Sequence, residues 1–442
     1  MRRAFPSWLR WGLAACIVSA LATFPSAHSS HAAGKVTLTW ETSDDPFWTS
    51  ASQTVINAYT KLHPNVSVSL IKVPSANYDQ KLFLQAASGT LPDVVRTSDG
   101  ETVPLASHHI LLDMQPFVNA DPSFNVGDIY QNFLNLGRLP GQSGLYMMPF
   151  SADAVLMFYN KDMFDKAGVA YPTAKWTYQD FLKAAQKLTL KDSSGKVTQW
   201  AISGALTGWW ATYAPWIRGF GGDVLTPDGK HSNLSSPGSL AGIQALADLV
   251  LKYKVEPGPS VVFPTDPFFS GHAAMYFSVH GAVGAVQQAV GKKFRWDVQV
   301  MPSFPNGSRW NGMGTAGWAV SAGSKNRSAA WDIVKFVGSV QGQTALAKLG
   351  VTMPIRKSML NNPVWKVPGL NNQAFVQAIK TGMMPPQLTP LDSAINCGTV
   401  YFGLSSTTIA TMFSQILHGT PVATAAKTAD AAINGCVNSL SS

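Results

Sequence analysis

Carboxylates follow several of the predicted strands of this 442-residue chain, at positions where they could do chemistry. Asp44 and Asp45 come after a strand that ends near Trp40, Asp99 and Glu101 come after the strand at Val94–Val95, and Asp153 follows Met148-Pro149-Phe150. A carboxylate can accept hydrogen bonds from hydroxyl groups, and two carboxylates that flank one glycosidic bond can hydrolyse it. These residues therefore leave both sugar binding and sugar hydrolysis open.

Tryptophans lie beside these polar groups in loops that are rich in glycine. Trp209, Trp210 and Trp216 occur between Gly204 and Asp223, and Trp310 occurs between Phe304 and Trp318. Flat indole rings suit the apolar faces of sugar rings, although any single Trp could equally be a core residue. As a set, these tryptophans favour ligand binding.

Motifs for other chemistry are absent or out of context in the sequence. Residues 312–317 fit the pattern GxGxxG, but a strand-like segment follows them where a dinucleotide site needs a helix, so we expect a tight crossover and no cofactor. The sequence contains no Gly-x-Ser-x-Gly, no His-Glu-x-x-His and no EF-hand spacing. We therefore expect no metal and no catalytic nucleophile.

The elements that must position these residues alternate between strands and helices. Val36, Leu38 and Trp40 alternate as a strand, a helix with helical spacing from residue 55 to 62 follows, and residues 66–70 alternate again. A second helix from 78 to 87 should end at Gly89. This βαβαβ order predicts an α/β fold with an open sheet whose ligand crevice lies at the carboxyl ends of the strands.

The second half of the chain repeats this order. Thr177-Tyr178-Gln179-Asp180 has the form of a capping box, and Ser236-Pro237 is a typical helix start. No tandem repeat or low-complexity linker separates the two halves. We therefore expect two lobes joined by several chain crossings, with a cleft between them.

Composition excludes several classes of protein. The chain has 46% hydrophobic residues, only 13% charged residues and 14 Trp, which excludes a disordered protein. Beyond the N-terminus no apolar run reaches the length of about 20 residues needed to span a bilayer. Lys and Arg are scattered, so nucleic acid is not an expected partner in spite of a formal charge of +9.

The N-terminus has the order of a secretory signal. Arg2, Arg3 and Arg10 precede an apolar stretch that ends at Phe24, and small residues continue to Ala33, so residues 1–33 are the expected signal peptide. Its removal lowers the excess of basic over acidic residues from nine to six. A lipid anchor at Cys16 is the alternative.

Two cysteines, Cys397 and Cys436, remain in the mature chain. An exported protein meets an oxidising compartment, where an even pair favours one disulfide, with two buried thiols as the alternative.

Four segments of the sequence together resemble a known family. They are 148–168 (with Tyr159-Asn160-Lys161-Asp162-Met163-Phe164), 88–95 (Ser-Gly-Thr-Leu-Pro-Asp-Val-Val), 269–275 and 353–358. In this order they resemble the sugar-binding type of extracellular solute-binding proteins, which serve ABC importers and include maltose-binding protein. The resemblance covers essentially the whole mature chain.

The resemblance implies a two-lobed periplasmic-binding-protein fold with three hinge crossings and a central ligand cleft. Matching positions place the crossings near 151–154, 312–315 and 351–353, which gives an N-terminal lobe of residues 34–151 and 313–351 and a C-terminal lobe of residues 152–312 and 352–442. The two lobes would close on the ligand.

The implied function is substrate binding for an ABC carbohydrate importer, without catalysis, in the periplasm or outside the cell. The expected partners are a mono- or oligosaccharide and the permease subunits, and the protein is expected to be a monomer. Where many family members carry a Trp after residues 273–275, this chain has His280, which could replace it. Glycerol phosphate and peptide remain alternative ligands; a phosphate would need Arg309 or Arg356. The expected ligand-binding residues are Trp40, Asp44, Asp45, Asp99, Glu101, Asp153, Trp209, Trp210, Trp216, His280, Trp310 and Arg356.

Overall fold

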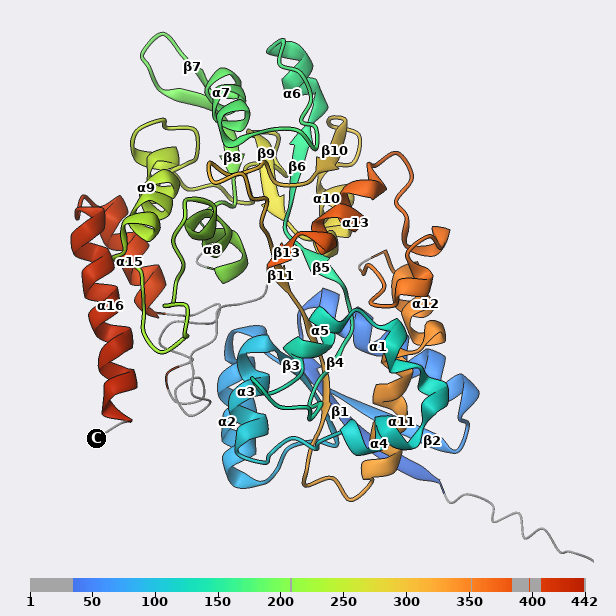
Figure 1. Cartoon of the computed structure of the whole chain (residues 1–442). Helices are drawn as coiled ribbons and strands as arrows, with labels where there is room; N and C mark the ends of the chain where they lie inside the picture. Colours follow the sequence, from blue (N-terminus) through green and yellow to red (C-terminus); the bar gives the residue numbers. More distant parts are fainter. Residues whose placement is uncertain (1–34, 207–208, 351, 384–396, 398–406, 441–442) are drawn as a thin grey trace, which may run out of the picture. The chain divides into compact units, whose positions relative to one another are not determined.

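A computed structural model describes residues 35–206, 209–350, 352–383, 397 and 407–440 (Figure 1). The predicted signal peptide, including Cys16, lies outside these residues. Contacts among Cα atoms make residues 36–442 one compact unit. No helix in the described ranges is long and apolar enough to cross a membrane.

The first of three sheets contains the N-terminal strands in the order β2-β1-β3-β12-β4. The strands β1, β2 and β3 are parallel, whereas β12 runs antiparallel to β3 and β4. Their bounds are β1 Val36–Ser43, β2 Val66–Val73, β3 Val94–Ser98, β4 Met148–Pro149 and β12 Ala316–Val320. The carboxyl ends of β1 and β3, with the predicted acidic residues, therefore meet at one edge, as the sequence predicted.

The second sheet has the order β10-β6-β9-β8-β7. Here β8 and β9 are parallel, and β6 is antiparallel to both β9 and β10. The bounds are β6 Leu156–Asn160, β7 Leu190–Lys191, β8 Val197–Ser203, β9 Ala273–Ser278 and β10 Trp296–Gln299. All five residues of β6 are buried, as expected for a strand covered on both faces.

A small third sheet joins β13 (Gly382–Met383), β11 (Asn311–Gly314) and β5 (Asp153–Ala154). The chain passes from β4 of the first sheet into β5, and from β11 directly into β12 of the first sheet. Two of the predicted crossings therefore coincide with transitions between sheets. The third prediction includes Val351, which lies outside the described residues.

The GxGxxG segment is mostly extended chain in β11 and β12, whereas the sequence suggested a tight crossover. A Cβ at Gly312 would lie 2.1 Å from the carbonyl oxygen of Ala211, and a Cβ at Gly317 would lie 2.0 Å from that of Met148. These glycines thus permit close backbone packing at the crossing.

Helices cover the sheets and confirm the predicted helix starts. Thr177 and Asp180 form a capping box at α7, Ser236 caps α9, and Gly89 ends α2 in the left-handed conformation (φ 67°). The helices before the hinge strands are α1 Pro46–Leu62, α2 Tyr78–Ser88, α3 Asp99–Ser107, α4 Gln115–Ala120 and α5 Gln131–Leu136. Those of the second half are α6 Lys161–Lys166, α7 Tyr178–Leu188, α8 Trp210–Gly219, α9 Pro237–Leu251, α10 Val283–Val290, α11 Arg327–Gly338, α12 Val340–Lys348, α13 Asn372–Lys380, α15 Thr407–Leu417 and α16 Val422–Ser439.

A disulfide joins Cys397 to Cys436 of α16. This bond confirms the predicted pair and excludes the alternative of two free thiols.

Candidate functional site

Asp153 is a buried acid in strand β5 of the third sheet. It pairs with Gly314 across the β5–β11 ladder, and only 8% of its surface is exposed. Burial raises its pKa to about 6, although the Ser151 hydroxyl and the Gly281 amide lower it in part. Its Oδ1 atom is buried and has no hydrogen-bond partner among the described residues. A buried acceptor without a donor is costly, and a ligand hydroxyl could supply that donor.

Trp209 packs on Gly314, which is the strand partner of Asp153. A Cβ on Gly314 would come within 2.8 Å of the Cζ2 atom of Trp209, so the indole ring lies directly over this glycine. Trp209 is only partly buried, and Trp210 packs edge-on against it with ring centroids 6.3 Å apart. The structure therefore brings together a carboxylate and an accessible indole ring that were predicted from separate segments.

The other tryptophans of the predicted site are less accessible. Trp40 and Trp216 have no exposed surface, and Trp210 is 1% exposed. Trp40 packs on Trp318, and Trp216 packs on Phe304. These three rings belong to the hydrophobic cores, so their placement favours the packing role that the sequence left open.

Trp310 is half-buried, and the Arg218 guanidinium lies 5.7 Å from the centre of its ring. His280 is buried beside Phe375, at 4.7 Å between ring centroids, and burial lowers its pKa to about 4. It follows β9 and precedes Gly281, whose amide faces Asp153. His280 is therefore a buried, neutral imidazole.

The acidic residues at the edge of the first sheet bind nearby backbone. Asp44 accepts hydrogen bonds from the Ser75 amide and hydroxyl, both at 2.8 Å, which lowers its pKa. Asp45 is the N-cap of α1 and accepts the amide of Phe47 at 2.8 Å. Glu101 accepts the Ser98 amide at 2.6 Å in a capping box, and the side chain of Asp99, the first residue of α3, lies outside the described part.

Arg356 is a structural residue in this arrangement. Its guanidinium donates to the carbonyl oxygens of Gly338, Asn125 and Phe124 and forms an ion pair with Asp128 at 3.2 Å. Only 4% of the residue is exposed. It therefore fastens chain segments and has little capacity left for a ligand.

Arg96 and Trp48 lie near the predicted acidic residues but were not among the residues that the sequence predicted for the site. Arg96, on β3, stacks its guanidinium between the rings of Tyr78 (4.3 Å) and Trp48 (5.2 Å). Trp48 also packs on Phe150, the residue after β4, with centroids 4.8 Å apart. Trp48 follows the Asp44-Asp45 pair by three residues in the sequence, so the search for aromatic residues beside carboxylates could have included it. Nothing in the strand pattern distinguishes Arg96.

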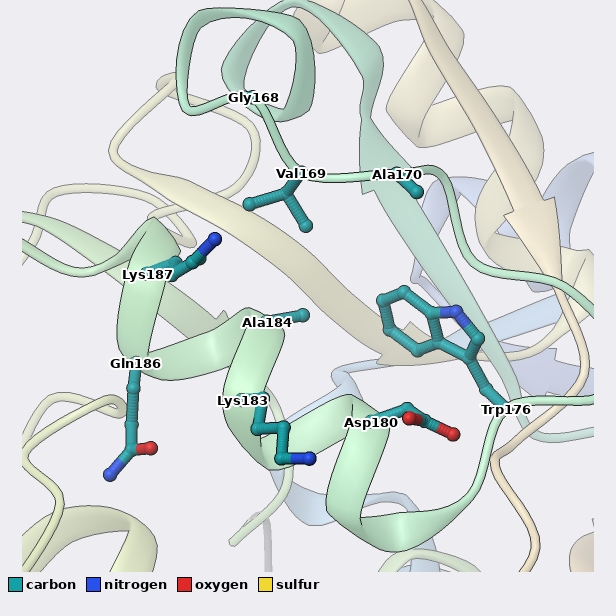
Figure 2. A pocket seen from close by; sticks show the side chains of 9 residues that line it. All are labelled: Gly168, Val169, Ala170, Trp176, Asp180, Lys183, Ala184, Gln186 and Lys187. Atoms are coloured by element: carbon teal, nitrogen blue, oxygen red, sulfur yellow. The ribbon is translucent and has the colours of Figure 1, made fainter.

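A hollow of about 580 Å³ lies elsewhere, between residues 168–170 and α7 (Figure 2). Figure 2 shows the Trp176 ring beside it, with Asp180, Lys183 and Lys187 around the opening. None of the predicted ligand residues lines it, and the Asp180 carboxylate is already bonded to Thr177. We therefore place the candidate site at Asp153 and Trp209. Among the described residues, no group of three or more His, Cys, Asp or Glu could hold a metal ion.

Comparison with known proteins identifies the family. Residues 48–344 match the bacterial extracellular solute-binding protein family. The chain belongs to this family. It is therefore a binding protein and not an enzyme, and the secreted hydrolase considered from the sequence is not favoured.

Individual relatives agree with this assignment. A binding protein of Brucella abortus (strain 2308) is 25% identical over 337 residues, which cover 74% of this chain and 78% of that protein. The sn-glycerol-3-phosphate-binding periplasmic protein UgpB of Pectobacterium atrosepticum is 25% identical over 284 residues, or 59% and 60% of the two chains. The ABC substrate-binding protein Lmo0181 of Listeria monocytogenes, solved with cycloalternan, has a TM-score of 0.77 at 23% identity and covers 91% of this chain and 99% of its own. This structural similarity establishes the two-lobed fold of periplasmic binding proteins.

Proposed function

We propose that the protein binds a carbohydrate at the crossing of β5 and β11 and delivers it to an ABC importer. The observation that carries this proposal is the buried, unpartnered Oδ1 atom of Asp153 beside the indole ring of Trp209. A sugar offers both a hydroxyl donor for the carboxylate and an apolar face for the ring. Similarity to a protein solved with cycloalternan supports the same ligand class.

Four acidic residues of the predicted set are proposed as additional ligand contacts. Asp44, Asp45, Asp99 and Glu101 share one edge of the first sheet, because they follow the parallel strands β1 and β3. They are proposed to contact the ligand when the lobes close on it, and Asp44, Asp45 and Glu101 would use the oxygen atoms that are not bonded to backbone amides. Trp310 is proposed as a peripheral contact, while Trp40, Trp210, Trp216, His280 and Arg356 are proposed to shape and support the site.

The sequence predicted an N-terminal lobe of residues 34–151 and 313–351 and a C-terminal lobe of residues 152–312 and 352–442. We propose these lobes with a different position for the third crossing. Arg356 contacts residues 124–128 and 338, and Ile355 accepts the Tyr130 amide at 3.0 Å. In contrast, the amide of Asn371 donates to the carboxylate of Asp297, in β10 of the second sheet, at 2.6 Å. We therefore propose that the third crossing lies between Trp365 and Asn371, rather than at 351–353.

Export, a monomeric state and docking on permease subunits complete the proposal. Export is supported by the signal-like N-terminus, and docking on permease subunits is supported by membership of the extracellular solute-binding protein family. Mass spectrometry of the secreted protein would show whether the chain begins near Gly34 or carries a lipid at Cys16.

Glycerol phosphate is the second candidate ligand, because a relative of 25% identity binds it. Of the two cations that the sequence offered for a phosphate, Arg356 is occupied by Asp128 and three carbonyl groups. Only Arg309 is left of that pair, which makes a phosphate site less well supported than a sugar site.

A thermal-shift screen tests the proposal directly. Maltose, maltotriose, a cyclic glucose oligosaccharide, tagatose and glycerol 3-phosphate form the panel. A ligand at about 100 times its dissociation constant adds roughly 2.7 kcal/mol of stability. A shift with a saccharide supports the proposal; a shift with glycerol 3-phosphate alone would replace it with the second candidate. Calorimetry with Trp209→Ala then tests the location.

A further inference from the structure

Glu256 is a buried acid that holds the chain at the end of β8. It follows α9, and the carbonyl oxygen of the residue before it, Val255, accepts the amides of Ala201 and Ile202 of β8, both at 3.0 Å. The Oε1 atom of Glu256 continues this contact and accepts the amides of Ala205 at 2.9 Å and Leu206 at 3.4 Å. Only 5% of Glu256 is exposed, so the carboxyl group replaces a strand partner that this stretch of backbone lacks.

The backbone that Glu256 holds shortly precedes a residue of the proposed site in the sequence. Three residues after Leu206 comes Trp209, the N-cap of α8, whose ring lies over Gly314. Gly314 is the strand partner of Asp153. The carboxyl group of Glu256 thus holds backbone that lies three and four residues before Trp209 in the sequence.

The electrostatic surroundings of Glu256 favour its neutral form. Its pKa is raised to about 7, mainly by burial and to a smaller extent by the negative charge of Asp266, while the two backbone amides oppose the rise. Asp266 is itself bonded to the Ser203 hydroxyl at 2.9 Å and the Phe268 amide at 2.8 Å. The Oε2 atom of Glu256 is buried and has no partner among the described residues, so the extra charge there is not compensated by a hydrogen bond.

We infer that Glu256 is a proton-sensitive positioning residue, which holds the segment before Trp209 most firmly when its carboxyl group is neutral. This inference rests on the proposed role of Trp209 in the ligand site. Its direction follows from linkage: a local opening that brings the carboxyl group into water restores its ordinary acidity, so loss of the proton favours the opened state. An extracytoplasmic binding protein meets the pH of its surroundings, and this contact would transmit that pH to the site.

Hydrogen exchange of the free protein tests the inference without a ligand. Peptides that contain Ala205 and Leu206 are followed by mass spectrometry at pH 5 and pH 8, with rates corrected for the intrinsic effect of pH. In the wild type, protection of these amides should fall by about tenfold or more between the two pH values. Ala201 and Ile202, which bind the Val255 carbonyl group, are the internal control and should not respond.

Two variants separate the acceptor from the proton. Glu256→Gln keeps an acceptor oxygen and cannot ionise, so its protection should be similar at both pH values. Glu256→Ala removes the acceptor and should lose protection at both. Equal protection in all three proteins, or an unchanged pH response in Glu256→Gln, would overturn the inference.

The link to ligand binding is measured with the panel saccharide that gives the largest thermal shift. Wild-type affinity should weaken from pH 7 to pH 8.5, where Asp153, with a pKa of about 6, is already mostly ionised, and Glu256→Gln should remove this change. If exchange responds as expected but affinity does not, the positioning role is overturned. If no saccharide binds, the exchange data still decide whether Glu256 holds the segment, and only the proposed function fails.

Discussion

Replacement of Asp153 by Asn should stabilise the free protein and weaken ligand binding. An acid whose pKa is raised by folding binds protons more strongly in the native state, so its contribution to stability is fully present below pH 3.8 and is lost as the pH rises through about 6. At pH 7 the buried charge therefore costs about 3 kcal/mol, since a shift of about two pKa units corresponds to that energy. Asparagine has a similar shape and avoids this cost.

Urea unfolding of the wild type and of Asp153→Asn between pH 4 and pH 7 measures the effect. The variant should gain less than about 1 kcal/mol at pH 4 and up to about 3 kcal/mol at pH 7, because Asp153 is already largely neutral at the lower pH. Calorimetry with a bound saccharide should show a loss of at least about 1 kcal/mol in affinity, since a charge-assisted hydrogen bond is replaced by a neutral one. This opposite response of stability and binding is typical of a residue kept for function.

Two results would refute the reasoning. If Asp153→Asn is no more stable than the wild type at pH 7, the carboxylate is not desolvated as the structure indicates. If stability rises and affinity is unchanged, Asp153 is a buried acid without a role in the site. Asp192→Asn is a matched control, because Asp192 is an exposed acid that accepts the Ser194 amide and lies outside the proposed site.

Three further predictions follow from the same contacts. Trp209→Ala should reduce saccharide affinity by at least about 1 kcal/mol with little change in melting temperature. Trp216→Ala removes a ring with no exposed surface and should cost about 3–5 kcal/mol of stability. An equal loss of stability in the two variants would place Trp209 in the core. Replacing Cys397 and Cys436 by Ser opens a loop with a sequence separation of 39 and should lower the unfolding free energy by about 2–4 kcal/mol in denaturant melts, and a smaller change would mean that the closed segment adds little. Gly312→Ala should destabilise the protein, because its Cβ would lie 2.1 Å from a carbonyl oxygen, and thermal melting equal to that of the wild type would show that the crossing can relax.

The sequence was sufficient for the fold because its signals there are local. The alternation in β1 and β2, the capping box at Thr177 and the left-handed Gly89 each depend on neighbouring residues, and the structure confirms all of them. The disulfide could also be predicted, because the export signal and an even cysteine count do not depend on three-dimensional contacts.

The site was harder to predict because accessibility is decided by tertiary packing. Trp209 and Trp210 are neighbours in the same glycine-rich loop, yet one ring remains partly exposed over Gly314 and the other is buried. A helix that begins at Trp210 turns successive side chains by about 100°, so adjacent residues face different surroundings. Loop composition predicted that some tryptophans reach the site and could not say which.

The same reasoning explains why Glu256 left no sign in the sequence. A carboxylate that caps a helix has a recognisable spacing, as Glu101 and Asp180 show, because its partners are three residues away. Glu256 binds amides about fifty residues away in the chain, across the end of β8, and lies in an ordinary Val-Glu-Pro segment. Its burial is what distinguishes it, because an acid that remains buried without a cation as partner costs stability unless its contacts are needed. Asp153 and Glu256 share this property, and both are proposed to serve the ligand site, one through its carboxylate beside Gly314 and the other through the backbone amides of Ala205 and Leu206. A ligand site that requires both acids would explain these two costs more simply than packing alone.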